Sequence, residues 1–197
     1  MNNLNDIYNN PLSRRWKKRY NELPNDVKER LNELSNQKIV QYQLDVIKRK
    51  RIIPQKGDVF LVNPKESLYF FGVVVNDNVN NINGDGLYVA MIFRNKAESL
   101  IDTNFVADYK NLLIAPSIIG KEYWTKGYFY NIELKAETFQ DIEYGFYSIA
   151  QEKYLNEYGK EVFKVPHLFG NFGVKTISGI AYQINKELII DNSLHAK

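Results

Sequence analysis

Few side chains in this sequence are suited to nucleophilic or metal chemistry. The chain has no Cys and only two His, so imidazole bases and metal ligands are scarce. His167 lies between Pro166 and Leu168, without the Ser and Asp partners that a catalytic triad would need. His167 and His195 are also too far apart in sequence for the ligand spacing of a zinc site. We therefore expect no catalytic residue, no bound metal and no cofactor.

Motifs for phosphate or calcium binding are missing as well. The sequence contains neither GxxxxGK[ST] nor GxGxxG. Gly84-Asp85-Gly86 lies in an Asn-rich stretch but lacks the spaced carboxylates of a calcium loop, so we interpret it as a hairpin turn. Glu143 and Glu152 flank an aromatic stretch, but nothing in the sequence indicates their separation or an environment that would raise a pKa. We assign them no acid–base role.

Aromatic side chains are dense in the second half of the chain, and two interpretations of them stay open. They fill a core and a half-buried sheet, which we favour, or they form a face that binds another protein, since Trp and Tyr are common interface anchors. The second interpretation gives four candidate partner-binding residues: Tyr128, Tyr130, Tyr144 and Tyr147.

The net charge of +3 hides an asymmetry along the chain. Residues 1–51 contain 12 Lys and Arg against six Asp and Glu, whereas residues 52–197 contain 14 against 17. The basic residues gather in two clusters, one around Trp16 at positions 14–19 and one at positions 48–51. Either cluster could hold nucleic-acid phosphates, with Trp16 stacked on a base. We favour the alternatives, an exposed arm docked through Trp16 and the solvated end of a helix.

Three runs rich in β-branched and aromatic residues, within residues 57–93, are the elements around which the chain is organised. They predict strands at 59–62, 68–75 and 86–93, joined by a turn and by a flexible loop at 76–85. Their short connections favour antiparallel pairing. Gly72 lies inside the second run, where glycine usually marks a bulge or bend.

Helical spacing flanks these strands on both sides. Val27, Leu31 and Leu34 predict one helix, and Ile39, Tyr42 and Val46 predict that a helix resumes before Pro54. Ile177, Ile180, Ile184 and Leu188 predict a C-terminal helix, with Thr176 or Ser178 as its cap. Two shorter elements are a strand at 105–109 and a strand–turn–strand at 154–163, for which a short helix at 151–158 is the competing interpretation.

We therefore predict an α+β fold, built on a strongly bent antiparallel sheet or a small SH3-like barrel with bends near Gly72 and Gly127. A helical, basic N-terminal extension at residues 1–53 precedes a β-rich domain at residues 54–197. Residues 1–20 carry no apolar run of a signal peptide, and no window approaches about 18 uninterrupted apolar residues. We expect a cytoplasmic protein that has no membrane partner.

Four segments together resemble the immunity protein 26 family of bacterial polymorphic toxin systems. They are KGDVFLV (56–62), YFFGVVV (69–75), APSIIGKEYWTKGYFYNIE (115–133) and YLNEYGKEVFKVP (154–166). The likeness covers residues 55 to about 190. The motif residues that it marks as structural are Gly57, Asp58, Phe71, Gly72, Trp124, Gly127 and Phe129.

The resemblance implies a protein that is not an enzyme and that neutralises a cognate toxin by covering the toxin's active site. A basic toxin would suit the mildly acidic segment after residue 51. Two alternatives stay open: a small barrel that binds nucleic acid through the basic clusters, and a barrel ribonuclease of a toxin–antitoxin pair. The scarcity of catalytic side chains disfavours the ribonuclease. The sequence indicates no oligomeric state.

Overall fold

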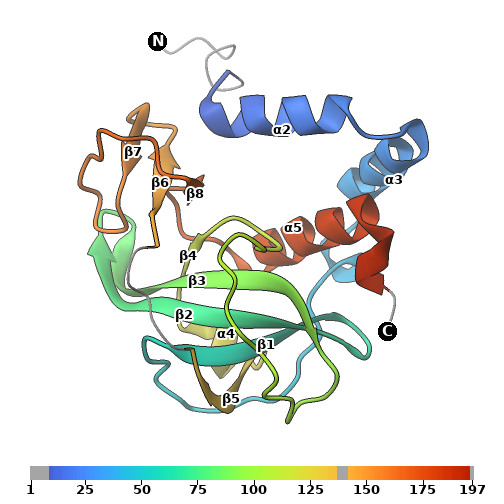
Figure 1. The fold of residues 1–197 in the computed structure, drawn as a ribbon, viewed down its shortest axis with the longest axis vertical. Helices are drawn as coiled ribbons and strands as arrows, with labels where there is room; N and C mark the ends of the chain where they lie inside the picture. The colour runs from blue at the N-terminus through green and yellow to red at the C-terminus, as the bar shows by residue number, and fades with distance from the viewer. Residues whose placement is uncertain (1–8, 137–141, 196–197) are drawn as a thin grey trace.

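The computed structural model describes residues 9–136 and 142–195 (Figure 1). Its helices are α2 (Pro11–Asn21), α3 (Asn25–Asn36), α4 (Glu122–Thr125) and α5 (Ile177–Ile190), with 3-10 turns η1 (Ile39–Gln41) and η2 (Asn192–His195). Its strands are β1 (Asp58–Lys65), β2 (Leu68–Asn81), β3 (Gly84–Ala97), β4 (Ser117–Ile119), β5 (Phe129–Lys135), β6 (Tyr144–Ser148), β7 (Lys153–Leu155) and β8 (Leu168–Asn171). Two sheets with helices towards both ends confirm the predicted α+β class.

Five antiparallel strands form the main sheet, in the spatial order β4-β3-β2-β1-β5. The short connections from β1 to β2 and from β2 to β3 explain why strands adjacent in sequence pair with each other. Within the described residues, β4 and β5 are the two edges and do not pair, so the sheet is open. Of the two architectures expected, the antiparallel sheet is therefore present and the closed barrel is wrong.

The hairpin of β2 and β3 is longer than predicted, because residues 76–85 continue it instead of forming a flexible loop. Val79 pairs with Leu87 in this extension, and both side chains are buried. The Asn76 amide donates a hydrogen bond to Glu157 Oε1 at 2.9 Å and so ties the hairpin to the second sheet. The Asn-rich composition led to the loop prediction, but here the amides act as anchors.

Gly72 makes room for a neighbouring ring. The sequence predicts a bend there, and the register of β2 against β3 does shift between Phe70 and Gly72. A Cβ on Gly72 would also lie 2.3 Å from the Phe60 ring of β1. Non-bonded carbons rest about 3.5–4.0 Å apart, so a side chain at this position would displace Phe60.

Gly127 does not bend a strand, contrary to the prediction, because it lies between α4 and β5. Its φ of +83° is a left-handed conformation that favours glycine. The backbone of Lys48 and Arg49 passes 2.8 Å from the place that a Cβ on Gly127 would occupy. The Gly127 carbonyl accepts a hydrogen bond from the Ile47 amide at 2.8 Å. The close approach is therefore to the N-terminal segment.

Apolar layers cover both faces of the main sheet. One face packs against α4 and α5 and contains Phe60, Phe70, Ile92, Trp124, Phe129, Ile180 and Ile184. The opposite face packs against the second sheet and the segment after β3, and it contains Leu61, Phe71, Met91, Phe93, Phe146 and Phe172. A sheet buried on both faces explains why its strands are continuous apolar runs without clean alternation.

Between residue 9 and β1 the structure describes two α-helices, α2 and α3, of which the sequence predicts only α3. α2 begins at an Asn-Pro signal, because Asn10 Oδ1 accepts from the amides of Leu12 and Ser13 at 3.0 Å and Pro11 occupies the first turn. α3 lies against α5 and buries the three residues predicted for this role: Val27, Leu31 and Leu34. Figure 1 shows α2 crossing the molecule on the side of α5 and the second sheet.

Residues 42–54 form neither helix nor strand, so the helix predicted to resume at Ile39 is wrong beyond the single turn η1. Leu44 is buried in the core cluster that also contains Trp124. The Asp45 amide donates to the Asn63 carbonyl at 2.8 Å. Burial of Leu44 and main-chain hydrogen bonds to other parts of the fold here outweigh a weak helical pattern.

The C-terminal helix is confirmed as α5, and Thr176 Oγ1 caps it by accepting from the Gly179 amide at 3.1 Å. β6 pairs antiparallel with β7 and parallel with β8 in a second sheet that the sequence did not reveal as separate. Gly159 has a φ of +82° in the predicted turn after β7. The strand predicted at 105–109 is wrong: Phe105 stacks on Phe71, with ring centroids 4.6 Å apart, without joining a sheet.

Candidate functional site: a basic cleft

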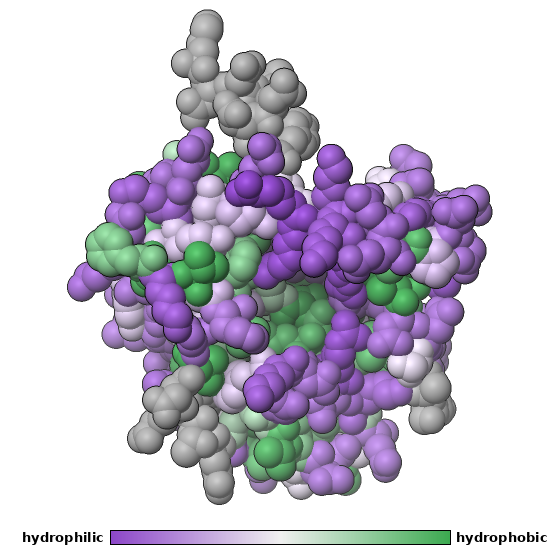
Figure 2. Space-filling view, turned by 45° about the horizontal axis from the view of Figure 1, so that its top comes forward, coloured by the Kyte–Doolittle hydropathy of each residue, from purple (hydrophilic) through white to green (hydrophobic). Residues whose placement is uncertain are grey.

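A cleft of about 440 Å³ opens between α2, α5, β8 and the segment leading into β4; we call it the basic cleft. Its charged lining residues are Arg15, Arg19, Arg94, Lys175, Lys186 and Glu187, with His167 the one His. Figure 2 shows a hollow with hydrophobic side chains at its base and hydrophilic side chains around its rim. The cleft therefore combines positive charge with apolar surface.

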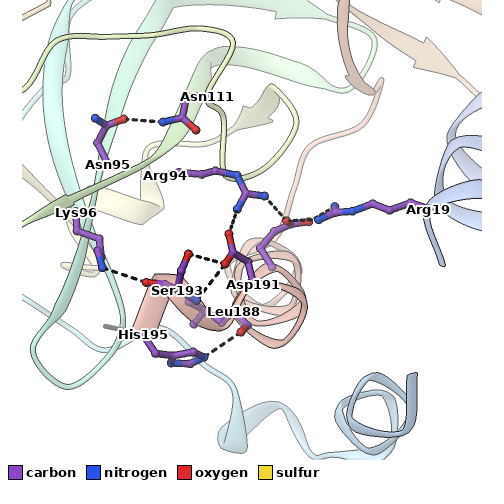
Figure 3. Close-up of polar contacts among 10 residues, drawn as sticks. Arg19, Arg94, Asn95, Lys96, Asn111, Leu188, Asp191, Ser193 and His195 are labelled. Carbon is purple, nitrogen blue, oxygen red and sulfur yellow. Dashed lines mark hydrogen bonds and ion pairs between the residues drawn. The ribbon is translucent and has the colours of Figure 1, made fainter. Parts of the chain in front are cut away.

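An ion-pair network fixes α2 and β3 to α5 at the wall of the cleft. Glu187 is 8% exposed and accepts from Arg19 at 2.6 and 2.8 Å, one hydrogen bond to each carboxylate oxygen. Arg94 donates to Glu187 at 2.7 Å and to Asp191 at 3.0 Å (Figure 3). The hydrogen bond to Glu187 raises the pKa of Arg19. Such bidentate pairs fix geometry, and this one holds α2 at its distance from α5.

Two cation–ring contacts complete the docking of α2. Lys186 Nζ of α5 lies 3.1 Å from the centroid of the Trp16 ring. The Arg15 guanidinium lies 4.3 Å from the Phe169 ring of β8 and donates to the Phe169 carbonyl at 3.1 Å. Consecutive residues of α2 thus reach the two opposite walls, one on α5 and one on the second sheet.

Three cations of the cleft have no acidic partner. Arg15, Lys175 and Lys186 form no ion pair within the described part of the chain, whereas Arg19 and Arg94 share Glu187. Burial lowers the pKa of Lys186 to about 8 and also lowers the pKa of Arg15 and of Lys175. Since desolvation disfavours the charged form, these cations would gain from an anion that enters the cleft.

The aliphatic and Phe residues of the lining are Leu12, Leu112, Leu113, Ile114, Ala115, Pro116, Leu168 and Phe169. Gly170 allows β8 to approach this segment, because a Cβ on Gly170 would lie 2.1 Å from the Pro116 carbonyl oxygen. The backbone contact between these two segments joins the second sheet to the main sheet beneath the cleft.

Two of the predicted partner-binding residues lie at or next to β5, at an edge of the main sheet. Tyr128 is half-buried, packs on the side that faces α5, and its hydroxyl accepts from the Gln43 amide at 2.7 Å. Tyr130 is half-buried, and Lys50 Nζ lies 4.7 Å from the centroid of its ring. Both tyrosines therefore contact the segment at residues 42–54, which follows η1.

The other two predicted partner-binding residues, Tyr144 and Tyr147, lie on β6 of the second sheet. The Tyr144 hydroxyl donates to Glu157 at 2.6 Å, and burial together with this bond raises the pKa of Tyr144. Tyr147 is 6% exposed, and its ring centroid lies 5.2 Å from that of Tyr154. Tyr144 packs on the face of the main sheet opposite to Tyr128. The structure does not bring the four tyrosines together, and their role in binding remains a prediction.

The motif residues occupy packed or conformationally special positions. Phe71, Trp124 and Phe129 are at most 2% exposed, and Gly57 has a φ of +90°. The Trp124 indole N–H donates to Asn131, whose amide donates to Asp58, so two motifs far apart in sequence meet at one side chain.

The sequence does not predict the basic cleft. The one sequence signal for it is the cluster at positions 14–19, from which Arg15, Trp16 and Arg19 line the cleft while Lys17 and Lys18 do not. Lys175 and Lys186 have no other Lys or Arg close to them in the sequence, so they form no basic cluster there. Only the packing of α2 against α5 and β8 assembles the set.

Neither a metal centre nor a membrane span is found in the parts of the chain that the structure describes. No group of three or more His, Asp or Glu there could hold a metal ion. No helix in the same ranges has the length and apolar character needed to cross a bilayer. Fold and cleft together define a small α+β protein with a recess whose cations are suited to holding an anionic group.

A sequence model of the immunity protein 26 family matches residues 55–157, just over half of the chain. The chain belongs to this family. The matched range runs from the entry of β1 to the end of β7 and leaves out α2, α3, β8 and α5. No curated protein and no solved structure matches the chain.

Proposed function

We propose that this protein acts in the cytoplasm as an immunity protein, which binds a bacterial protein toxin and neutralises it by covering the toxin's active site without catalysing a reaction. The observation that carries the proposal is membership of the immunity protein 26 family. Neutralisation by occlusion requires a stable surface rather than catalytic groups. A stable interface buries about 1,200–2,000 Å² in total, which demands a firm scaffold.

The elements inside and outside the family match contribute different features that support this role. The matched segment contains the main sheet, which is buried on both faces and therefore rigid. Residues outside the match add α2, α3, β8 and α5, of which α2, β8 and α5 enclose a cleft on one side of that sheet. We propose residues 54–197 as the immunity domain and residues 1–53 as an extension that completes its surface.

Co-expression in a sensitive host tests the proposal. The toxin domain encoded beside this gene would be expressed with and without this protein, and growth and binding would be measured at low and high salt. Growth rescue, with an affinity retained at high salt, is expected because apolar burial does not depend on ions. Absence of rescue, together with tight salt-sensitive binding to DNA or RNA, contradicts the proposal and favours a nucleic-acid-binding role.

A further inference from the structure

We infer that the basic cleft receives an acidic segment of the toxin, with carboxylates placed against Arg15, Lys175 and Lys186 and an apolar side chain against Leu112 and Leu168, which are half-buried in its lining. This inference rests on the proposed function and specifies the surface and the chemistry of the partner. It differs from the expectation drawn from net charge, which favoured a basic partner for the segment after residue 51. Local charge at the cleft is opposite in sign to the average of that segment.

The first argument is charge balance. Of the five Lys and Arg that line the cleft, two share Glu187, and the other three have no carboxylate within ion-pair distance among the described residues. Lys175 and Lys186 are partly buried, and cations held away from water without a partner are destabilised by the loss of hydration. A carboxylate supplied by another protein would form charge-assisted hydrogen bonds with groups already held in place.

The second argument is size and composition. A volume of about 440 Å³ lies within the ~300–1,000 Å³ range of clefts that bind small ligands, which is room for a few side chains of a partner. The half-buried part of the lining is apolar at Leu112, Leu168 and Phe169, and the walls are cationic. A segment that alternates acidic and apolar side chains would satisfy both parts.

A nucleic acid fits this site less well. Single-stranded nucleic acids bind by stacking bases on open aromatic faces. Here Lys186 Nζ lies 3.1 Å from the centroid of the Trp16 ring, and the Arg15 guanidinium lies 4.3 Å from the centroid of the Phe169 ring. Each ring therefore has one face occupied by a cation. The unpaired cations also converge into a recess, whereas a phosphate backbone would require a line of exposed ones.

The third argument comes from the extent of the family match. The three unpaired cations all lie outside residues 55–157, whereas the apolar segment before β4 lies inside. The cleft is thus assembled from the family's sheet and from helices added on either side of the matched segment. Such an arrangement suits recognition of this chain's own partner on a shared scaffold.

The experiment compares two charge-matched double variants of the full chain. Arg15→Gln with Lys186→Gln removes two cleft cations, and Lys17→Gln with Lys18→Gln removes two exposed cations of the same region. Affinity for the toxin domain encoded beside this gene would be measured by calorimetry. The Kd of the cleft variant for the toxin domain is expected to be about tenfold or more higher than that of the wild type, because charge-assisted hydrogen bonds are lost. The Kd of the control variant should rise less than about threefold. Melting temperature distinguishes lost binding from lost folding. Arg15 and Lys186 also contact the Phe169 and Trp16 rings, so the cleft variant is expected to melt somewhat lower, and affinity is compared at a temperature where both variants are fully folded.

The outcomes separate this inference from the proposed function. If the wild-type protein neither binds nor protects against the toxin, the proposed function fails. If it protects and the cleft variant binds as tightly as the control, only the cleft assignment is overturned. A peptide with alternating Asp and Phe should compete with the toxin for the cleft, and its Asn and Phe analogue should not. Competition by a single-stranded oligonucleotide, abolished in the cleft variant, would instead overturn the acidic-segment assignment.

Discussion

The indole N–H of Trp124 donates a hydrogen bond of 2.7 Å to Asn131 Oδ1. The amide of Asn131 in turn donates to Asp58 Oδ2 at 2.8 Å, and that oxygen also accepts from the Gln55 amide at 2.8 Å. Lys135 pairs with the other oxygen of Asp58. The Lys-Gly-Asp motif and the Trp motif are therefore two ends of one polar chain, which β5 completes.

Replacement of Trp124 tests the two parts of this arrangement separately. Trp124→Ala empties a large core site and is expected to lower the free energy of unfolding by about 3–5 kcal/mol. Trp124→Phe keeps an aromatic ring but leaves Asn131 without its donor, so we expect about 1–3 kcal/mol. Denaturant unfolding measures both. Trp16→Phe, at a half-buried position on α2, is the control, and equal losses at the two tryptophans would refute a core role for Trp124.

Gly72 is expected to be intolerant of even a methyl group. Gly72→Ala would place a carbon 2.3 Å from the Phe60 ring, and we expect a loss of about 1–3 kcal/mol through overpacking. Adding Phe60→Leu removes the ring that the methyl group would strike. The double variant should therefore lose less than the sum of the two single losses, which a double-mutant cycle would measure. Strict additivity would show that Phe60 is not the obstacle.

Truncation from the N-terminus tests where the extension ends. Removing residues 1–37 deletes α2 and α3 but leaves residues 42–54, which include the core residue Leu44. The remaining chain should therefore still fold cooperatively. Removing residues 1–51 also deletes Leu44, and we expect about 2–5 kcal/mol of further loss, as for an emptied leucine site. Circular dichroism during thermal unfolding compares the two. Equal stability would instead support a boundary near residue 53, as the sequence predicts.

Much of the fold could be read from local patterns. Continuous apolar runs predicted β1, β2 and β3, and the spacing of Ile180 and Ile184 predicted α5, because burial on one or two faces imposes these patterns. The errors occur where distant contacts decide. Residues 42–54 have helical spacing, yet Leu44 and the amide of Asp45 are engaged by other segments of the fold.

The candidate site was less predictable than the fold. Arg15 and Lys186 are separated by most of the chain, and they line the same cleft because α2 is held against α5, where Arg19 pairs with Glu187. In the sequence, nothing distinguishes Glu187, which pairs with Arg19 and Arg94, from a solvated acidic residue of a helix. The aromatic stretch, which was conspicuous in sequence, is divided between two sheets, and its rings are buried or half-buried there.

Lys186 makes the stability of the protein depend on pH in a window that the structure defines. Burial is the main cause that lowers the pKa of Lys186, from 10.5 to about 8; nearby Arg19 adds to this effect and Glu187 opposes it. The Trp16 and Tyr182 rings, whose centroids lie 3.1 and 6.0 Å from the ammonium nitrogen, are its other neighbours. Between about pH 8 and 10.5 the unfolded chain holds a proton that the folded chain has released.

Because the unfolded state binds more protons in this window, the contribution of Lys186 to the free energy of unfolding rises as pH increases from about 8. The difference between wild type and Lys186→Met should therefore shift in favour of the wild type from pH 7.5 to 10. Tyrosines with raised pKa values, such as Tyr109 at about 12, act in the opposite sense at higher pH, but both proteins share them. Urea unfolding at half-unit pH intervals gives the curves, and Lys17→Met, at an exposed position on α2, should run parallel to the wild type. If Lys186→Met also runs parallel, the Lys186 ammonium is hydrated in the fold and does not face the cleft as a desolvated cation.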